Sequence, residues 1–331
     1  GSVDIKSGTS SVASSGNVSI GSSSAAVSGD VVLESGSAMN GNAGNLVLSS
    51  GSAIGGMAGD VNLMSSETNT GAGGLLNIRA GSTSDSESGG NVSIDAGSSG
   101  NASGGSIIMN SGSGSTSSGD IGLLTNANAA GETGIVSIAT GVSSTSSGSI
   151  EVSTGSSQNT AGSIDLNAGS SSGLVGGEVN ISAGKSGSTG SAGVNISGGD
   201  ATGSNTGGSI GVSSGYSDSG SSGSVEINTT VASRSGSSGV ISLRSGSSAS
   251  AESGQVLIET GSSQSAGGIE LSVGSSNLSG GNIEINAGSS DNANGGSVSV
   301  TSGAASFGNS GSMSVKSATS GVYGDVVLGS G

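Results

Sequence analysis

The amino-acid sequence predicts an all-β protein, a parallel β-helix (β-solenoid) built from about 23 repeats of 14–15 residues. Three observations support this prediction. Short segments alternate aliphatic with small polar residues, glycines flank each segment, and the same unit returns from end to end of the chain. A short segment with one dry face cannot bury that face alone, so its stability must come from neighbouring units, as in a solenoid.

The repeat is clearest at residues 148–170. Ile150 and Val152 alternate with polar residues, and Gly155 ends the segment. Ile164 and Leu166 restate the same pattern one repeat later. The consensus is Gly-x-Φ-x-Φ-x-(Ser/Ala/Thr)-Gly, where Φ is aliphatic, followed by a stretch of small polar residues. The first aliphatic position returns every 14.7 residues or so, and we expect the glycines to form corners of a coil.

The number of repeats in one coil is open, and we prefer one. Outward residues match on adjacent repeats, for example Asn180 and Asn195, and like residues stack favourably on adjacent rungs. The pair Glu270 and Glu284 favours a coil of two or three repeats, because like charges on adjacent rungs repel unless a cation or an offset relieves them. Glu151 and Asp165 raise the same objection.

The composition excludes an ordinary globular interior. The 331 residues include 69 Gly, no Pro, no Cys, no His and no Trp, and aromatic residues make up 1%. Glycine and serine at this level resemble a flexible linker, but the hydrophobic residues, 30% of the chain, recur at fixed phase. We therefore expect ordered repeats that form a single continuous domain over residues 1–331, with no linker to mark a boundary.

The acidic charge of the chain disfavours two classes of binding partner. The net charge is −16, which disfavours binding to nucleic acid or to anionic lipid, since both need a basic surface. No apolar run approaches the 18 or so residues that a membrane-spanning helix needs, so we expect no membrane insertion.

Catalytic chemistry is not indicated. There is no His, and the carboxylate pairs lack the cations and aromatic platforms that a β-helix acting on polysaccharide would need. We expect no enzyme and no catalytic, cofactor-binding or metal-binding residues. Weak Ca²⁺ binding at stacked carboxylates is the one alternative, and four aspartates recur just after a corner glycine: Asp30, Asp60, Asp120 and Asp325.

Candidate N-glycosylation sites are the clearest site signal. The motif Asn-x-Ser/Thr begins at seven positions, none with Pro at x: Asn17, Asn91, Asn101, Asn180, Asn195, Asn228 and Asn277. Most of these fall on the outward side of a predicted strand, and Asn101 and Asn277 fall in a polar loop. We expect some of them to carry glycan if the chain passes through a secretory pathway.

The run Gly90-Asn91-Val92-Ser93-Ile94-Asp95-Ala96-Gly97, echoed at residues 296–303, resembles the repeats of secreted parallel β-helix proteins of the adhesin and filament type, such as the filamentous haemagglutinin group. The resemblance covers essentially the whole chain. The repeats of that group carry a second aliphatic strand, whereas here the second half of each repeat is rich in Ser, Gly and Ala. The resemblance implies an exported protein, extracellular or on the cell surface, that serves as a rod or attachment fibre.

These observations predict a structural function. We expect a subunit of an extracellular filament, sheath or adhesin stalk, with the chain itself as partner in a head-to-tail homo-oligomer. The end rungs, residues 1–8 and 324–331, would expose strand edges for end-to-end stacking. The alternative is a β-solenoid adhesin module that binds a surface, a glycan or ice. A row of identical outward side chains would favour the alternative, but the outward residues here vary and form no Thr row.

Overall fold

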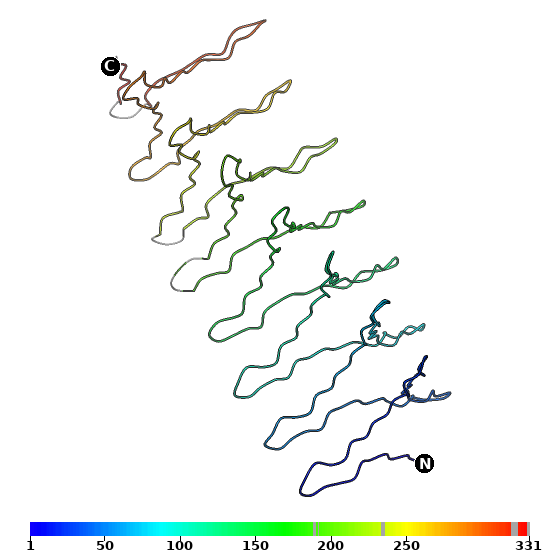
Figure 1. Ribbon diagram of the computed structural model, residues 1–331. Coiled ribbons are helices and arrows are strands. Elements are labelled where there is room, and N and C mark those ends of the chain that lie inside the picture. Colours follow the sequence, from blue (N-terminus) through cyan, green and yellow to red (C-terminus); the bar gives the residue numbers. More distant parts are fainter. Residues whose placement is uncertain (188–189, 191, 233–235, 319–323, 330–331) are drawn as a thin grey trace. The chain divides into compact units, whose positions relative to one another are not determined.

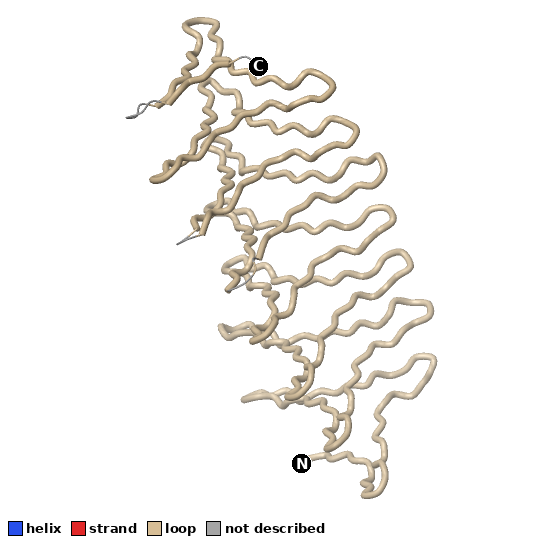
Figure 2. Tube along the Cα trace, turned by 90° about the vertical axis from the view of Figure 1, so that its left-hand side faces the viewer, coloured by secondary structure: helices blue, strands red, loops and turns tan. Residues whose placement is uncertain are grey.

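The structure, a computed structural model, describes residues 1–187, 190, 192–232, 236–318 and 324–329 (Figure 1). Contacts within the chain group into two units, Gly1–Ile164 and Asp165–Gly331. The division falls between two neighbouring residues of one aliphatic segment, in the repeat that begins at Gly162, and no linker marks it. Each unit consists of extended segments joined by loops that fold back on themselves (Figure 2).

The predicted β-solenoid is wrong, because the described residues contain no helix and no β-strand (Figure 2). In a solenoid the backbone of one rung bonds to the next rung, a full repeat away. Here the backbone hydrogen bonds between described residues join positions only 7 to 9 residues apart, within one repeat. The predicted coil of one repeat, with Ile150 above Ile164, is therefore not formed. Residues 1–8 and 324–329 likewise form no terminal rungs, and residues 330–331 lie outside the described residues.

Pairs of glycines close the polar loops. The loop at residues 98–104 begins after Gly97 and ends at Gly105, and the Gly105 amide donates to the Gly97 carbonyl oxygen at 2.8 Å. We call such a hydrogen-bonded glycine pair a neck. A methyl group at residue 105 would lie 3.3 Å from the Gly97 nitrogen, so glycine permits this close approach of two backbones. The other necks are Gly8–Gly16, Gly51–Gly59, Gly81–Gly90, Gly112–Gly119, Gly169–Gly177, Gly199–Gly208, Gly215–Gly223, Gly288–Gly296 and Gly303–Gly311.

In many loops a side-chain hydroxyl group accepts a hydrogen bond from a backbone amide of the same loop. This hydroxyl group belongs to the residue two positions after the glycine that begins the loop. In the loop after Gly288, the Ser290 hydroxyl oxygen accepts a hydrogen bond from the Ala293 amide at 3.0 Å. Such side-chain bonds stabilise tight turns that the backbone alone leaves unsatisfied. We call this residue the loop cap, and it recurs at Ser10, Thr83, Ser99, Ser143, Ser157, Ser171, Ser217, Ser248 and Ser276.

Loops with alanine at the cap position contain a glycine with a positive φ instead. The loop after Gly51 has Ala53 at that position and Gly55 at a φ of 80°. Alanine offers no side-chain hydrogen-bond acceptor, and glycine reaches positive φ without the steric cost that a Cβ atom imposes. The same exchange occurs with Gly41 after Ala38, Gly203 after Ala201 and Gly308 after Ala305.

The aliphatic faces of the segments are not buried against neighbouring units, although the solenoid prediction required such burial. None of the described residues is buried, and the aliphatic side chains of the segments remain largely exposed. This follows from the missing ladder, because segments that do not pair cannot cover one another's dry faces. The described part of the chain also holds no helix long and apolar enough to cross a membrane.

Candidate functional surface

The candidate functional surface of each repeat is formed by the two exposed aliphatic residues of its extended segment. In residues 91–96, Val92 is 53% exposed and Ile94 is 66% exposed. The backbone of this segment makes no backbone–backbone hydrogen bond to another described residue. The same pattern recurs along the chain, with the first residue of each pair generally the more shielded, as at Ile150 and Val152. We call these residues the aliphatic pairs.

Polar side chains between the aliphatic residues bond along their own segment. The Ser93 hydroxyl donates to the Asp95 carboxylate at 2.7 Å, and the Asn286 side-chain amide donates to the Glu284 carboxylate at 2.7 Å. In an extended chain successive side chains point to opposite sides, so residues two apart lie on the same side and can meet. Two further pairs within extended segments have the same spacing: Asp4 with Lys6 at 2.6 Å and Ser242 with Arg244 at 2.9 Å.

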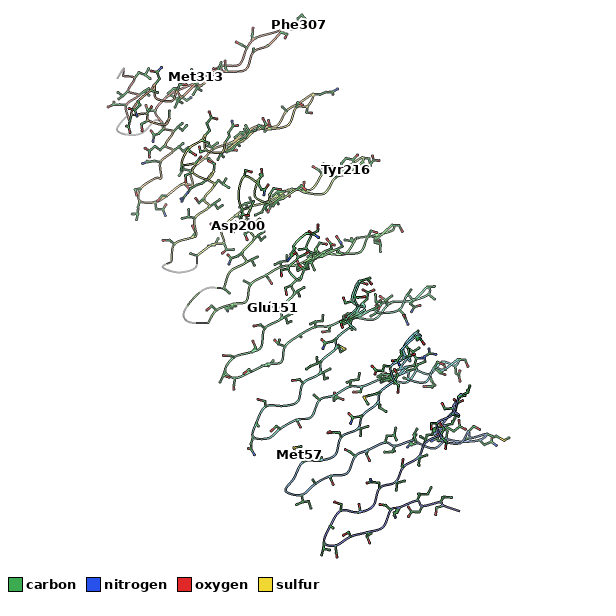
Figure 3. The ribbon with its side chains drawn as sticks, in the orientation of Figure 1. Met57, Glu151, Asp200, Tyr216, Phe307 and Met313 are labelled. Carbon is green, nitrogen blue, oxygen red and sulfur yellow. The ribbon has the colours of Figure 1, made fainter. Side chains whose placement is uncertain are left out.

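The loops carry a second set of apolar side chains. Phe307 is 98% exposed and lies at the outer end of its loop (Figure 3). Val142 and Leu278 are exposed to a similar extent in their own loops. Each of these three residues stands between small or polar neighbours, so none belongs to a continuous apolar patch within its loop. The aliphatic pairs, in contrast, stand at the same place in every repeat.

All seven predicted glycosylation asparagines are exposed. Five lie at extended segments: Asn17, Asn91, Asn180, Asn195 and Asn228. The other two lie in loops beside a loop cap, since the Ala102 amide donates to Ser99 and the Leu278 amide donates to Ser276. Exposure gives a glycan room at every site, and glycosylation itself stays a prediction.

The predicted cation sites are not assembled from several acidic side chains. The described residues contain no group of three or more His, Cys, Asp or Glu side chains placed to hold a metal ion. Of the carboxylate pairs singled out in the sequence, Glu270 and Glu284 are exposed, and Glu284 accepts the bond from Asn286. Glu151 belongs to the first unit and Asp165 to the second. The aspartates that follow corner glycines are exposed at the start of their segments, and weak Ca²⁺ binding there stays a prediction: Asp30, Asp60, Asp120 and Asp325.

Sequence reasoning missed the necks and the loop caps. The signal was present, because Ser, Thr or Asn stands two positions after many of the glycines that end a segment. Asn128 plays the same part without a glycine two positions before it, since its side-chain oxygen accepts from the Ala130 amide at 3.1 Å. The Gly-Ser-Ser runs that resemble linker are therefore turn signals.

Comparison with known proteins identifies no relative of this chain. Protein-family models, curated proteins and solved structures were each searched, and none matches the chain.

Proposed function

We propose that the chain is a structural subunit of an extracellular filament, sheath or adhesin stalk, and that its partner is a second copy of itself. The observation that carries the proposal is the exposure of the aliphatic pairs throughout the chain. End-to-end stacking of solenoid rungs is not part of it, because the described residues form no rungs. Association instead occurs side by side, through the extended segments. The proposal gives the chain no catalytic role.

Hydrophobic burial supplies the driving force for association. Fully burying one Val, Leu or Ile side chain is worth about 1.5–3 kcal/mol. Each repeat offers two such residues, for example Val92 and Ile94, which one chain leaves in water. A second copy presents the same pairs at the same spacing, so a single register brings many of them together. Small gains in each repeat then add along the interface.

Hydrogen bonding by the backbone of the segments would make the association of two copies directional. Extended segments with unpaired N–H and C=O groups are templates for pairing with another chain. The segment at residues 106–111 makes no backbone–backbone hydrogen bond to another described residue. Lateral pairing between copies would satisfy these groups and cover the aliphatic pairs in one step.

The acidic surface opposes association and makes it depend on salt. The net charge is −16, and the exposed carboxylates of one copy repel those of the next. Salt screens this repulsion, with a Debye length of about 10 Å at 0.1 M. We therefore expect assembly to rise with ionic strength, which is the opposite of an assembly held together by ion pairs.

Sedimentation velocity and electron microscopy test the proposal. The purified chain is expected to form larger species as concentration and salt rise, with fibres or sheets in the micrographs. A monodisperse monomer at high concentration in high salt would refute it. Replacing six aliphatic-pair residues by Ser is expected to abolish assembly: Ile94, Ile138, Ile181, Ile227, Ile258 and Ile285.

A matched variant separates the aliphatic pairs from general hydrophobicity. It replaces by Ser six exposed apolar residues of the loops: Val12, Ile54, Val142, Leu174, Leu278 and Phe307. Assembly of this loop variant is expected to match that of the unaltered chain. Equal loss of assembly in both variants would show that the aliphatic pairs have no special role.

A further inference from the structure

The sequence contains two Asn-Gly dipeptides, Asn40–Gly41 and Asn294–Gly295. A peptide nitrogen that belongs to glycine is the least hindered, because glycine has no Cβ atom. It is therefore the nitrogen best able to attack the side-chain amide carbon of a preceding asparagine. The two sites have the same local chemistry, and the structure holds them differently.

We propose that Asn40 is a site of self-modification in the folded chain, converting through a cyclic imide to isoaspartate and aspartate, while Asn294 is protected. The Gly41 nitrogen forms a bond to the Asn40 side-chain carbonyl carbon, and the bond from that carbon to the amide nitrogen breaks. The Gly41 amide proton leaves with that nitrogen as ammonia. Water then adds to either imide carbonyl and opens the ring, so no oxidant or reductant is needed.

The loop around Asn40 leaves the reacting atoms free to rotate. Its cap position is Ala38, which offers no side-chain acceptor to hold the turn. Gly41 has a φ of 105°, and a methyl group built on it would meet nothing within 4 Å. Gly36 and Gly44, which bound the loop, are not joined by any of the backbone hydrogen bonds found among the described residues. Asn40 and Gly41 are both exposed, so water reaches the imide.

The loop around Asn294 is held on both sides of the dipeptide. The Ala293 amide donates to the cap Ser290 at 3.0 Å, and the Gly296 amide donates to the Gly288 carbonyl oxygen at 2.9 Å. Cyclisation requires rotation between Asn294 and Gly295. With its two flanking residues tied, this rotation breaks the neck or the cap bond.

The modification changes the loop in two ways. Each conversion replaces a neutral amide by a carboxylate, which adds to the net charge of −16. The isoaspartate product also inserts one methylene group into the backbone and lengthens the loop at residues 37–43. Because the conversion accumulates with time, the fraction converted at Asn40 rises with the age of the chain. The inference stands independently of the proposed function, because it depends on one loop and not on assembly.

Cleavage by hydroxylamine tests the proposal on the full chain. Hydroxylamine opens the cyclic imide and breaks the chain at that residue, so Asn40 yields fragments 1–40 and 41–331, and Asn294 yields 1–294 and 295–331. In the folded chain, cleavage at Asn40 is expected to be about two- to twelvefold faster, the range that one backbone hydrogen bond of ordinary net strength supports. Equal rates, or faster cleavage at Asn294, would overturn the proposal.

Three controls make the test specific. In concentrated guanidinium chloride both sites are expected to react at the same rate, because the dipeptides are identical. Asn40→Gln is expected to remove the fast fragment pair and leave cleavage at Asn294 unchanged. Ser290→Ala deletes the cap and is expected to accelerate cleavage at Asn294, whereas Ser289→Ala is not. A Ser290→Ala chain with unaltered cleavage at Asn294 would refute the argument from loop restraint. Mass spectrometry of aged, untreated protein is expected to find the converted residue at Asn40 first.

Discussion

Replacing one glycine of a neck by alanine is expected to open that neck only when the glycine is the donor. In the neck Gly199–Gly208, the Gly208 amide donates to the Gly199 carbonyl oxygen at 2.9 Å. A methyl group at residue 208 would lie 2.9 Å from the Gly199 nitrogen, whereas one at residue 199 would meet nothing within 4 Å. Gly208→Ala is therefore the perturbation, and Gly199→Ala is its matched control.

The expected size of the effect follows from these distances. Non-bonded carbon contacts are best at about 3.5–4.0 Å, so the two backbones must separate by roughly 0.5 Å or more. That stretches the hydrogen bond to about 3.4 Å, beyond the usual range of about 2.7–3.2 Å. Losing such a bond costs about 0.5–1.5 kcal/mol. At about 1.4 kcal/mol per factor of ten, the neck opens about two- to twelvefold more often.

Amide hydrogen exchange, followed by NMR on chain labelled at glycine and alanine, measures this opening directly. Exchange of the residue 208 amide is expected to accelerate by the factor above in Gly208→Ala and to stay unchanged in Gly199→Ala. The more distant neck Gly81–Gly90 reports whether either change spreads along the chain. Equal acceleration in both variants, or none in Gly208→Ala, would refute the role given to the neck glycines.

Three further predictions concern the loops and segments. Ser99→Ala is expected to accelerate exchange of the Ala102 amide, which loses its acceptor at a cost of about 0.5–1.5 kcal/mol, while Ser98→Ala leaves it unchanged; equal effects would contradict the cap. Gly55→Ala places a Cβ atom at a φ of 80° and is expected to destabilise its loop by about 1–2 kcal/mol, seen as faster exchange of the Gly59 neck amide. Its neighbour Gly56, where a methyl group meets nothing within 4 Å, serves as the control, and a matching effect there would remove the conformational argument. The Asp4–Lys6 ion pair is exposed, so Lys6→Ala is expected to leave exchange at the neck Gly8–Gly16 the same in low and high salt, and any salt-dependent difference would show that the pair stabilises the loop.

The sequence by itself determined the local chemistry of the repeat. Alternation of aliphatic and polar residues implies an extended segment, and the bonds from Ser93 to Asp95 and from Asn286 to Glu284 connect side chains two apart along such segments. Several of the glycines that flank the segments lie where two backbones approach closely, as at Gly97 and Gly105. The extended shape of a segment depends on a few neighbouring residues, so a pattern of residue types is enough to predict it, whereas the pairing of glycines into necks was not predicted.

The candidate site was predictable only in part. The asparagines of the glycosylation motif are exposed, but the sequence did not reveal that Asn101 and Asn277 lie beside loop caps. Nor did it distinguish Asn40 from Asn294, because both precede glycine. The difference between these two comes from a neck and a hydroxyl group that act across the loop, and it appears only once the backbone path is known.

Only the tertiary structure decided whether the segments pair with one another. The sequence made a solenoid plausible because the repeats are regular, yet regular spacing is a property of the chain and not of its contacts. Among the described residues, every backbone–backbone hydrogen bond joins the two ends of one loop, such as Gly288 and Gly296. None of these bonds joins neighbouring segments. Pairing between repeats needs contacts a full period apart, and these depend on how every loop directs the next segment. The alternation of residue types therefore determined the shape of each segment, and the path of the loops determined that the aliphatic pairs stay exposed.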